Sequence, residues 1–258
     1  MEKISMFSWE EEYTHPKNQK LVAGLLDRLD CQAIYQVIPD EIPDEELRVF
    51  TDSCKAAGSE VYGLFGDRFW GLEEDGASML AQVEKVSKWN RRLGNKALKG
   101  LVMDVEPYLT DEWEMDTEAA MDLFVSNCVR TYEKAVDEGL VLIVCIPYYY
   151  DDQGRVEQLE RFISQGCDAI AVMNYEKEDE AGQIRNEEYL TRKYGKRLIH
   201  ITELQKPGYH GLEEHNTYYY DGLGAVRDSW RRLEEAFPKS DLGFSYHYLN
   251  VVRELADR

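Results

Sequence analysis

Two carboxylates stand two residues apart near the middle of the chain, at Asp104 and Glu106. They end an apolar run, LKGLVM, and burying a carboxylate costs free energy, so their position requires a reason. Neighbouring carboxylates raise each other's proton affinity, and a partly desolvated glutamic acid can stay protonated near neutral pH. Such an acid can protonate the leaving oxygen of a glycosidic bond, although an acidic loop or a metal pair would have the same spacing.

These acids need an element that positions them, and the chain alternates short apolar runs with longer amphipathic segments. We expect eight strands, at 3–9, 32–39, 60–66, 98–106, 140–148, 167–175, 197–205 and 242–249. Helical periodicity lies between them, for example at 18–30, 44–58, 117–139, 155–166 and 224–237. Eight β-then-α repeats predict an α/β protein, a single (β/α)8 TIM barrel domain over residues 1–258. A doubly wound open sheet competes, but no GxGxxG or GxxxxGK[ST] motif follows any strand.

The active site of such a barrel lies at the carboxyl ends of its strands. The period of two along a strand places Asp104 and Glu106 on one face, above Gly100 and Val102, so both should crown the barrel mouth. Many aromatic residues fit a sugar ligand, because pyranose rings stack on aromatic rings, although rim packing also uses them. From the other strand ends we expect substrate-binding residues at Trp9, Gln36, Asp67, Tyr148, Asn174, Glu176 and Tyr246.

The segment DVEPY at 104–108 resembles the second half of the DxxDxDxE motif of glycoside hydrolase family 18, the chitinases and their relatives. AVMNYE at 171–176 resembles the MxYD segment of the same family. The resemblance implies that Glu106 is the general acid, that Asp104 steadies the acetamido group of the substrate, and that Tyr175 assists it. It also implies a substrate that is an N-acetylhexosamine-containing or related glycan, and no cofactor.

The sequence departs from the family pattern at several positions. Leu101 and Val102 stand where the motif has further aspartates, and Glu176 replaces the aspartate that follows the tyrosine. The tryptophan of the eighth strand is absent, with Tyr246 and Tyr248 nearby. A non-catalytic, lectin-like barrel that only binds carbohydrate therefore remains an alternative, as does a lyase or a metal-dependent hydrolase.

A second resemblance is to retaining glycosidases, which carry an acid/base glutamate on strand four and a nucleophilic glutamate on strand seven. The segment ITELQ supplies Glu203 in the expected seventh strand, as the possible catalytic partner of Glu106. In that mechanism the two carboxyl groups stand about 5–5.5 Å apart. Pairing of Glu203 with an arginine, such as Arg197 or Arg227, is an equally good interpretation.

The bulk composition narrows the possible partners. The formal net charge of −20 repels phosphate backbones and anionic membranes, so no nucleic-acid partner is expected. No apolar run approaches the roughly 20 residues of a membrane span. The N-terminus carries acids where a signal peptide is basic, which indicates a cytoplasmic protein as given, or a secreted one if a leader was removed. The oligomeric state stays open.

Cysteines and histidines give no metal pattern. The five cysteines include no CxxC pair, which favours a reducing compartment and argues against a disulfide framework. His210 and His215, in the long segment 205–222, could line the cleft, but their HxxxxH spacing is not a zinc motif. We therefore expect no metal site.

Overall fold

The computed structural model describes residues 3–94, 97–151 and 154–257; the rest of the expected domain, residues 1–2, 95–96, 152–153 and 258, lies outside this description. Eight parallel strands close into a barrel in sequence order, and β8 pairs with β1. Each expected run contains one strand, so the predicted (β/α)8 barrel is confirmed. The strands are β1 (Ile4–Ser8), β2 (Ala33–Gln36), β3 (Glu60–Phe65), β4 (Gly100–Met103), β5 (Val141–Pro147), β6 (Ala169–Met173), β7 (Arg197–Glu203) and β8 (Leu242–His247).

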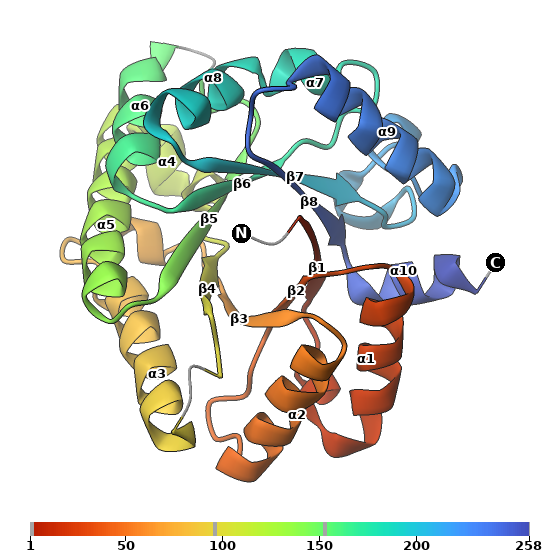
Figure 1. Ribbon diagram of the computed structural model, residues 1–258. Coiled ribbons are helices and arrows are strands. Elements are labelled where there is room, and N and C mark those ends of the chain that lie inside the picture. Colours follow the sequence, from red (N-terminus) through yellow and green to blue (C-terminus); the bar gives the residue numbers. More distant parts are fainter. Residues whose placement is uncertain (1–2, 95–96, 152–153, 258) are drawn as a thin grey trace.

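Helices form a layer around the outside of the strands (Figure 1). The longest, α5, starts where the Asp116 side chain accepts the Ala119 N–H at 3.1 Å, a typical N-cap. The helices are α1 (Gln19–Arg28), α2 (Asp44–Ala56), α3 (Ala77–Leu93), α4 (Asp111–Met115), α5 (Thr117–Asp137), α6 (Val156–Gln165), α7 (Glu180–Gln183), α8 (Arg185–Tyr194), α9 (Gly222–Ala236) and α10 (Leu249–Ala256). Short 3₁₀ turns are η1 (Glu11–Thr14), η2 (Pro16–Asn18), η3 (Trp70–Leu72), η4 (Pro107–Leu109), η6 (Tyr209–Gly211) and η7 (Glu214–Asn216).

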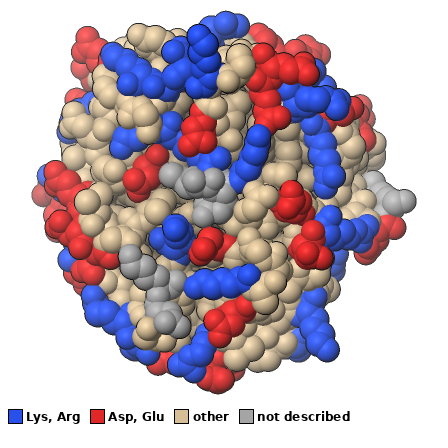
Figure 2. Space-filling model, in the orientation of Figure 1, with Lys and Arg blue, Asp and Glu red and all other residues tan. Residues whose placement is uncertain are grey.

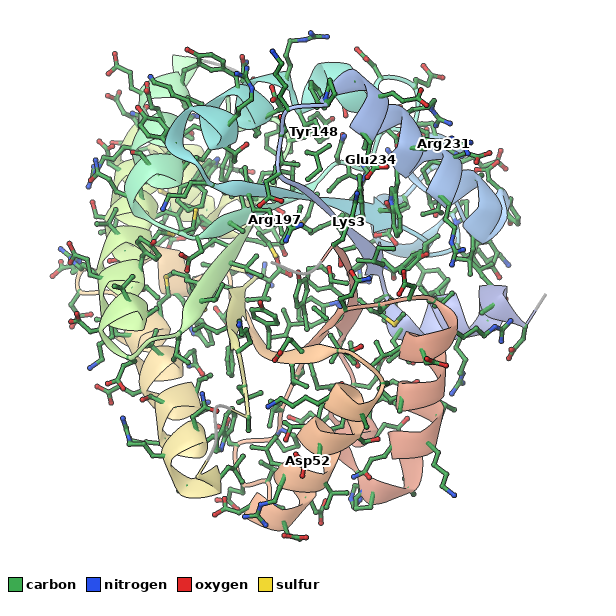
Figure 3. The ribbon with its side chains drawn as sticks, viewed as in Figure 1. Lys3, Asp52, Tyr148, Arg197, Arg231 and Glu234 are labelled. Atoms are coloured by element: carbon green, nitrogen blue, oxygen red, sulfur yellow. The ribbon has the colours of Figure 1, made fainter. Side chains whose placement is uncertain are left out.

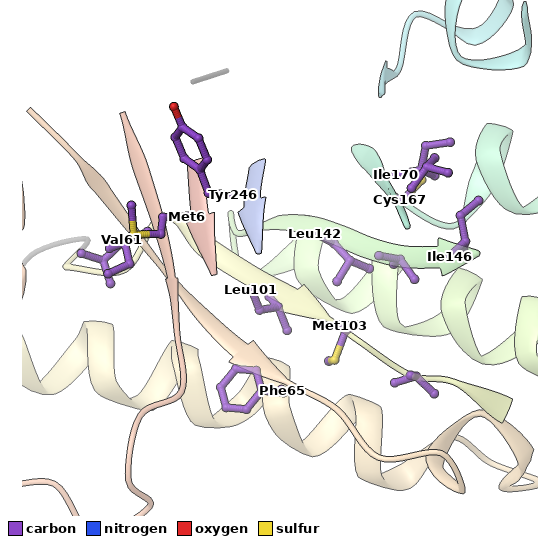
Figure 4. Close-up of a cluster of buried hydrophobic side chains, with 14 of the residues drawn as sticks. Met6, Val61, Phe65, Leu101, Met103, Leu142, Ile146, Cys167, Ile170 and Tyr246 are labelled. Carbon is purple, nitrogen blue, oxygen red and sulfur yellow. The ribbon is translucent and has the colours of Figure 1, made fainter. Parts of the chain in front are cut away.

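Two hydrophobic cores lie on the two faces of the barrel wall. Inside the barrel, Tyr35, Val102 and Ile143 belong to one buried cluster. Residues of the opposite strand face pack under the helices, and Figure 4 shows Leu101, Leu142 and other members of that outer cluster. Because both faces are buried, the strands are apolar almost throughout, as is usual for parallel sheets.

The amino ends of the strands face the viewer in Figures 1 to 3. Figure 3 labels Lys3 and Arg197, at the amino ends of β1 and β7, near the centre of this view. Each pairs with an acid, Lys3 with Glu234 and Arg197 with Asp241 at 3.2 Å. Figure 2 shows basic and acidic side chains mixed over this face. No helix in the described part of the chain is long and apolar enough to span a membrane.

Candidate active site

A pocket of about 510 Å³ opens at the carboxyl ends of the strands. Its walls come from the last residues of β6, β7 and β8 and from the segments that follow β1, β4, β6, β7 and β8. Among the described residues, no lysine or arginine lines it. The lining consists of Trp9, Glu10, Asp104, Glu106, Met173, Tyr175, Glu203, Gln205, His210, Leu212, His247 and Tyr248.

Strand β4 brings the two acids of DVEPY to this pocket. The strand ends at Met103, and the Asp104 N–H donates to the Phe65 carbonyl at 2.7 Å. Gly66 permits this close approach, because a Cβ there would lie 2.1 Å from the Asp104 carbonyl oxygen. Asp104 and Glu106 both line the pocket, in the place that the period-two pattern predicts.

The surroundings of Asp104 favour its protonated form. Burial, followed by the negative charge of Glu106, raises the pKa of Asp104 to about 7, while His247 and a hydrogen bond from the Cys145 thiol act in the opposite direction. The Tyr108 hydroxyl donates to Glu106 Oε1. Burial raises the pKa of Tyr108 as well, so the phenol remains a donor to the carboxylate.

Tyr175 lies two residues beyond β6 and also lines the pocket. Its ring stacks on the His247 imidazole, with 6.2 Å between the ring centroids and 28° between the planes. Burial, together with the charges of Glu203 and Asp104, raises the pKa of Tyr175 well above its ordinary value. The hydroxyl therefore keeps its proton and offers the pocket a hydrogen-bond donor.

Glu203, the last residue of β7, is almost fully buried in the pocket wall. Its Oε1 accepts the backbone N–H groups of Leu204 at 2.8 Å and Gln205 at 2.7 Å, and its Oε2 lies 3.0 Å from His247 Nδ1. Burial disfavours the charged form, but His247 and these hydrogen bonds outweigh it and lower the pKa of Glu203. The hydrogen-bonding side-chain partner of Glu203 is thus a histidine and not an arginine.

His247 also contacts the segment that follows β1. Trp9 Nε1 donates to His247 Nε2 at 3.1 Å, and the indole stacks on Phe7 with 6.2 Å between centroids. The next residue, Glu10, accepts the Asn250 amide N–H at 2.5 Å, and burial raises the pKa of the Glu10 carboxyl. Trp9 therefore lies in the pocket wall, as the sequence predicts, and Glu10 adds a fourth carboxyl group.

Two residues expected in the pocket lie on the outer face of the barrel wall. The Tyr246 ring packs against Trp230 of α9, with 4.6 Å between centroids, and belongs to the outer core of Figure 4. The Gln36 side chain is fully buried, and its amide donates to the carbonyls of Glu10 and Val37. The expectation that both residues line the pocket is therefore wrong. Successive residues of a strand face opposite sides of the barrel wall, and the inward positions near these two strand ends are Tyr35 and His247.

Asp67 and Tyr148 follow β3 and β5 but do not line the pocket. Asp67 is exposed, and its carboxylate accepts the Phe69 N–H at 2.8 Å within its own loop. Tyr148 packs edge to face on Tyr149, with 5.5 Å between centroids. The two side chains thus make contacts within their own loops, and the expectation that they line the pocket is wrong.

Asn174 and Glu176, the neighbours of Tyr175, also lie outside the lining. The buried Asn174 amide donates to the Glu180 carbonyl at 2.8 Å. Glu176 Oε2 lies 3.6 Å from His215 Nε2. Successive side chains after β6 point in alternate directions. Asn174 and Glu176, on either side of Tyr175, therefore contact the neighbouring loop and do not face the pocket.

The sequence reasoning missed His247, Glu10 and Met173. His247 follows Gly243 and Ser245 at a spacing of two, and this alternation was the available signal for an inward position. Glu10 was visible only as one of several acids in SWEEE. In the long segment before α9, His210 and Leu212 line the pocket, whereas His215 pairs with Glu176.

Across the residues that the structure describes, no group of three or more His, Cys, Asp or Glu side chains has the arrangement of a metal site. The acids of the pocket instead have protein partners: Tyr108 for Glu106, His247 for Glu203 and Asn250 for Glu10. The arrangement offers a protonated acid, a phenol donor and aromatic walls, which together suit acid catalysis on an uncharged ligand.

No protein-family model and no curated protein matches the sequence. Solved structures match it over almost its whole length. A GH18 chitinase mutant from Cycas revoluta, in complex with (GlcNAc)4, has a TM-score of 0.59 at 13% identity, with 98% of each chain covered. The chain has the fold of the family 18 barrels.

Two further solved structures have the same fold. The PgaB (BpsB) glycoside hydrolase domain from Bordetella bronchiseptica has a TM-score of 0.57 at 9% identity, covering 99% of this chain and 96% of that one. D-psicose 3-epimerase with D-tagatose, from Clostridium cellulolyticum H10, has a TM-score of 0.57 at 10% identity, covering 99% and 91%. Since the fold serves both hydrolases and an epimerase, the reaction must be argued from the pocket.

Proposed function

We propose that the chain is a glycoside hydrolase that cleaves a glycosidic bond in an N-acetylhexosamine-containing or related glycan, with Glu106 as the general acid. The observation that carries the proposal is the meeting of Asp104, Glu106 and Tyr175 in one pocket at the carboxyl end of the barrel. The fold shared with a chitinase and with a glycoside hydrolase domain supports the same reaction class.

In the proposed reaction, the proton of Asp104 passes to Glu106, which gives it to the leaving oxygen while the bond to the anomeric carbon breaks. Asp104 accepts the N–H of the substrate's acetamido group, and Tyr175 donates its hydroxyl proton in a hydrogen bond to the acetamido carbonyl. Held in this way, the carbonyl oxygen attacks the anomeric carbon, and Asp104 stabilises the positive charge that develops. Water then opens the cyclic intermediate, and the Glu106 carboxylate takes the proton from that water.

The surroundings of Glu203 favour this substrate-assisted reaction over a covalent one. A nucleophilic carboxylate needs a free oxygen, but Glu203 Oε1 accepts two backbone N–H groups and Oε2 accepts His247. Attack on the sugar would break hydrogen bonds that hold the carboxylate in a buried position. We therefore assign Glu203 to the support of His247.

A carbohydrate-binding barrel without catalysis is the second candidate. One observation favours it: Val102 is fully buried inside the barrel, at a position where the resembled motif has an aspartate. A pocket that lacks this acid can still bind a sugar through aromatic residues such as Trp9, Tyr175 and Tyr248.

Replacing Glu106 with Gln tests the proposal. With (GlcNAc)4 as the substrate, we expect the cleavage rate of Glu106→Gln to fall by about 10²- to 10⁴-fold, because the proton donor is lost. The matched control is Glu112→Gln, an exposed glutamate on α4 outside the pocket, which should keep wild-type activity. Calorimetry should find that Glu106→Gln still binds the oligosaccharide.

Three other outcomes are distinguishable. Cleavage that survives Glu106→Gln would refute the assignment of the acid. A wild-type protein that binds oligosaccharides of this class without cleaving them would establish the binding-only candidate. Activity that EDTA abolishes would indicate a metal-dependent barrel enzyme and would count against the proposed reaction.

A further inference from the structure

Both ring nitrogens of His247 have hydrogen-bond partners, and the two partners differ in kind. Nδ1 lies 3.0 Å from a carboxylate oxygen of Glu203, which can only accept. Nε2 lies 3.1 Å from the indole N–H of Trp9, which can only donate. The two contacts are satisfied together by one form of the ring, the neutral imidazole with its proton on Nδ1.

The Glu203 carboxylate cannot easily turn away from this arrangement. Its other oxygen accepts the N–H groups of Leu204 at 2.8 Å and Gln205 at 2.7 Å, so the backbone after β7 fixes its direction. The fixed carboxylate in turn fixes the proton of His247 on Nδ1 and leaves Nε2 as an acceptor. Trp9 is therefore held in the pocket wall through His247 by a glutamate on another strand.

A second proton on His247 would disrupt the contact with Trp9. Nε2–H and the indole N–H would then point at each other across 3.1 Å, two donors without an acceptor between them. The carboxylates of Glu203, Asp104 and Glu106 favour that second proton and raise the pKa of His247, although burial opposes it. The Trp9 N–H stabilises the neutral ring, so the two influences on His247 compete.

The other titratable groups near the His247 ring do not decide between its neutral and its protonated form. Tyr175, stacked on His247, keeps a neutral phenol, because its pKa is raised far above the ordinary value. The remaining titratable residues of the pocket lining are Glu10, His210 and Tyr248. Glu10 has the Asn250 amide as a partner, which leaves Glu203 as the carboxylate in direct hydrogen-bond contact with His247.

We propose that Glu203 and His247 are positioning residues for Trp9: the neutral histidine holds the indole in the pocket wall, and protonation of the histidine releases it. Trp9 is the aromatic surface on which a sugar ring can stack, so its release weakens sugar binding as the pH falls through the pKa of His247. The effect on sugar binding rests on the proposed function, whereas the release of Trp9 does not.

Tryptophan fluorescence tests the release without any ligand. The difference between the wild type and Trp9→Phe isolates the signal of Trp9 from the other tryptophans. We expect this difference signal to titrate with a midpoint above pH 6.5, because the neighbouring carboxylates raise the pKa of His247 although burial opposes them. In Glu203→Gln the midpoint should shift to lower pH by one unit or more, because the neighbouring negative charge is gone. In His247→Phe the transition should be absent.

The result that overturns the proposal is a transition that keeps the wild-type midpoint in Glu203→Gln and persists in His247→Phe. If circular dichroism shows that His247→Phe does not fold, Trp9→Phe provides a second test of the proposal. Without the opposing indole N–H, the pKa of His247 measured by NMR should rise; an unchanged pKa would also refute the proposal.

Sugar binding is measured separately, with (GlcNAc)4 and with Glu106→Gln as the common background, so that no cleavage occurs. We expect the Kd to rise by about three- to tenfold as the pH falls through the fluorescence transition, the equivalent of one hydrogen bond. Adding Trp9→Phe should weaken binding and remove this pH dependence. No sugar binding at any pH would refute the proposed function and leave the fluorescence result intact, whereas pH-independent binding without a fluorescence transition would refute this inference alone.

Discussion

Asp104 is buried beside the negative charge of Glu106, and both influences favour its protonated form. Burial and repulsion hold the pKa of Asp104 at about 7, far above that of a free aspartate. Asp104 therefore keeps a proton below about pH 7 and loses it above, and in the proposed reaction this proton passes to Glu106, the general acid. The pH dependence of the proposed reaction should therefore follow the protonation of Asp104.

We expect kcat/KM of the wild type to fall as the pH rises above about 7, because Asp104 loses its proton. In Asp104→Asn this decline should no longer begin near pH 7, and kcat should fall by about 10²-fold or more. Steady-state rates on (GlcNAc)4 across this pH range measure both effects. Asp111→Asn, an exposed change on α4, is the matched control. Superimposable profiles for Asp104→Asn and the wild type would contradict the assignment of the pH dependence to Asp104.

At the scale of elements, the pocket depends on how closely the ends of neighbouring strands approach. The ends of β3 and β4 meet where Gly66 faces the Asp104 carbonyl, and a methyl group has no space there. This contact sets the course of the segment that carries both acids. A glycine outside the pocket lining therefore controls the position of two carboxyl groups in the pocket.

We expect Gly66→Ala to destabilise the protein by about 1–3 kcal/mol and to reduce activity, because the new Cβ would force the Asp104 backbone aside. Gly24→Ala is the control: Gly24 lies exposed in α1 with no atom near its Cβ position, so this change should stabilise the helix by about 0.5–1 kcal/mol. Chemical denaturation and rate measurements on both variants compare them. Equal stability of the two would show that the close contact is unimportant.

The sequence predicted the elements better than the directions of their side chains. All eight strands were found, since each is an apolar run bounded by turns, and the position of Asp104 and Glu106 followed from period two. Tyr246 and Gln36 were misplaced because both faces of these strands are buried, so hydrophobicity does not distinguish inward from outward positions. His247 was missed for the same reason.

Loop residues were harder to predict for a different reason. Tyr148 and Asp67 stand at the ends of correctly predicted strands, yet their loops direct them into local contacts with Tyr149 and Phe69. Period two ends with the strand, and the direction of each later residue depends on tertiary contacts. The pairing of Glu203 with His247 joins residues 44 positions apart, which no local pattern indicates.

At the scale of the whole molecule, a buried histidine outside the pocket links stability to pH. His200 of β7 is fully enclosed, and burial lowers its pKa from 6.5 to about 3. The unfolded chain binds a proton near pH 6.5, but the folded chain does not until about pH 3. The contribution of His200 to the free energy of unfolding is therefore complete above pH 6.5 and is lost as the pH falls towards 3.

We expect the free energy of unfolding to fall with decreasing pH below 6.5, with His200 contributing up to about 1.4 kcal/mol per pH unit. His200→Gln should be less stable at neutral pH but should lose less stability on acidification. His15→Gln, an exposed histidine, serves as the comparison and should behave like the wild type. Urea titrations at several pH values measure the slopes; equal slopes for His200→Gln and the wild type would refute the assignment.

All five cysteines are free and buried, and burial raises their thiol pKa values, to about 12 for Cys31, Cys54 and Cys167. The thiolate is the nucleophile that attacks an alkylating reagent, so the folded protein should resist alkylation at every one of these positions. Labelling then occurs only when the barrel opens, and iodoacetamide incorporation over time should follow the unfolding rate. Rapid labelling of the folded protein would contradict this expectation. Cys54 lies in α2, Cys128 in α5 and Cys145 in β5, while Cys31 and Cys167 precede β2 and β6, so the order in which they are labelled would show which of these elements opens first.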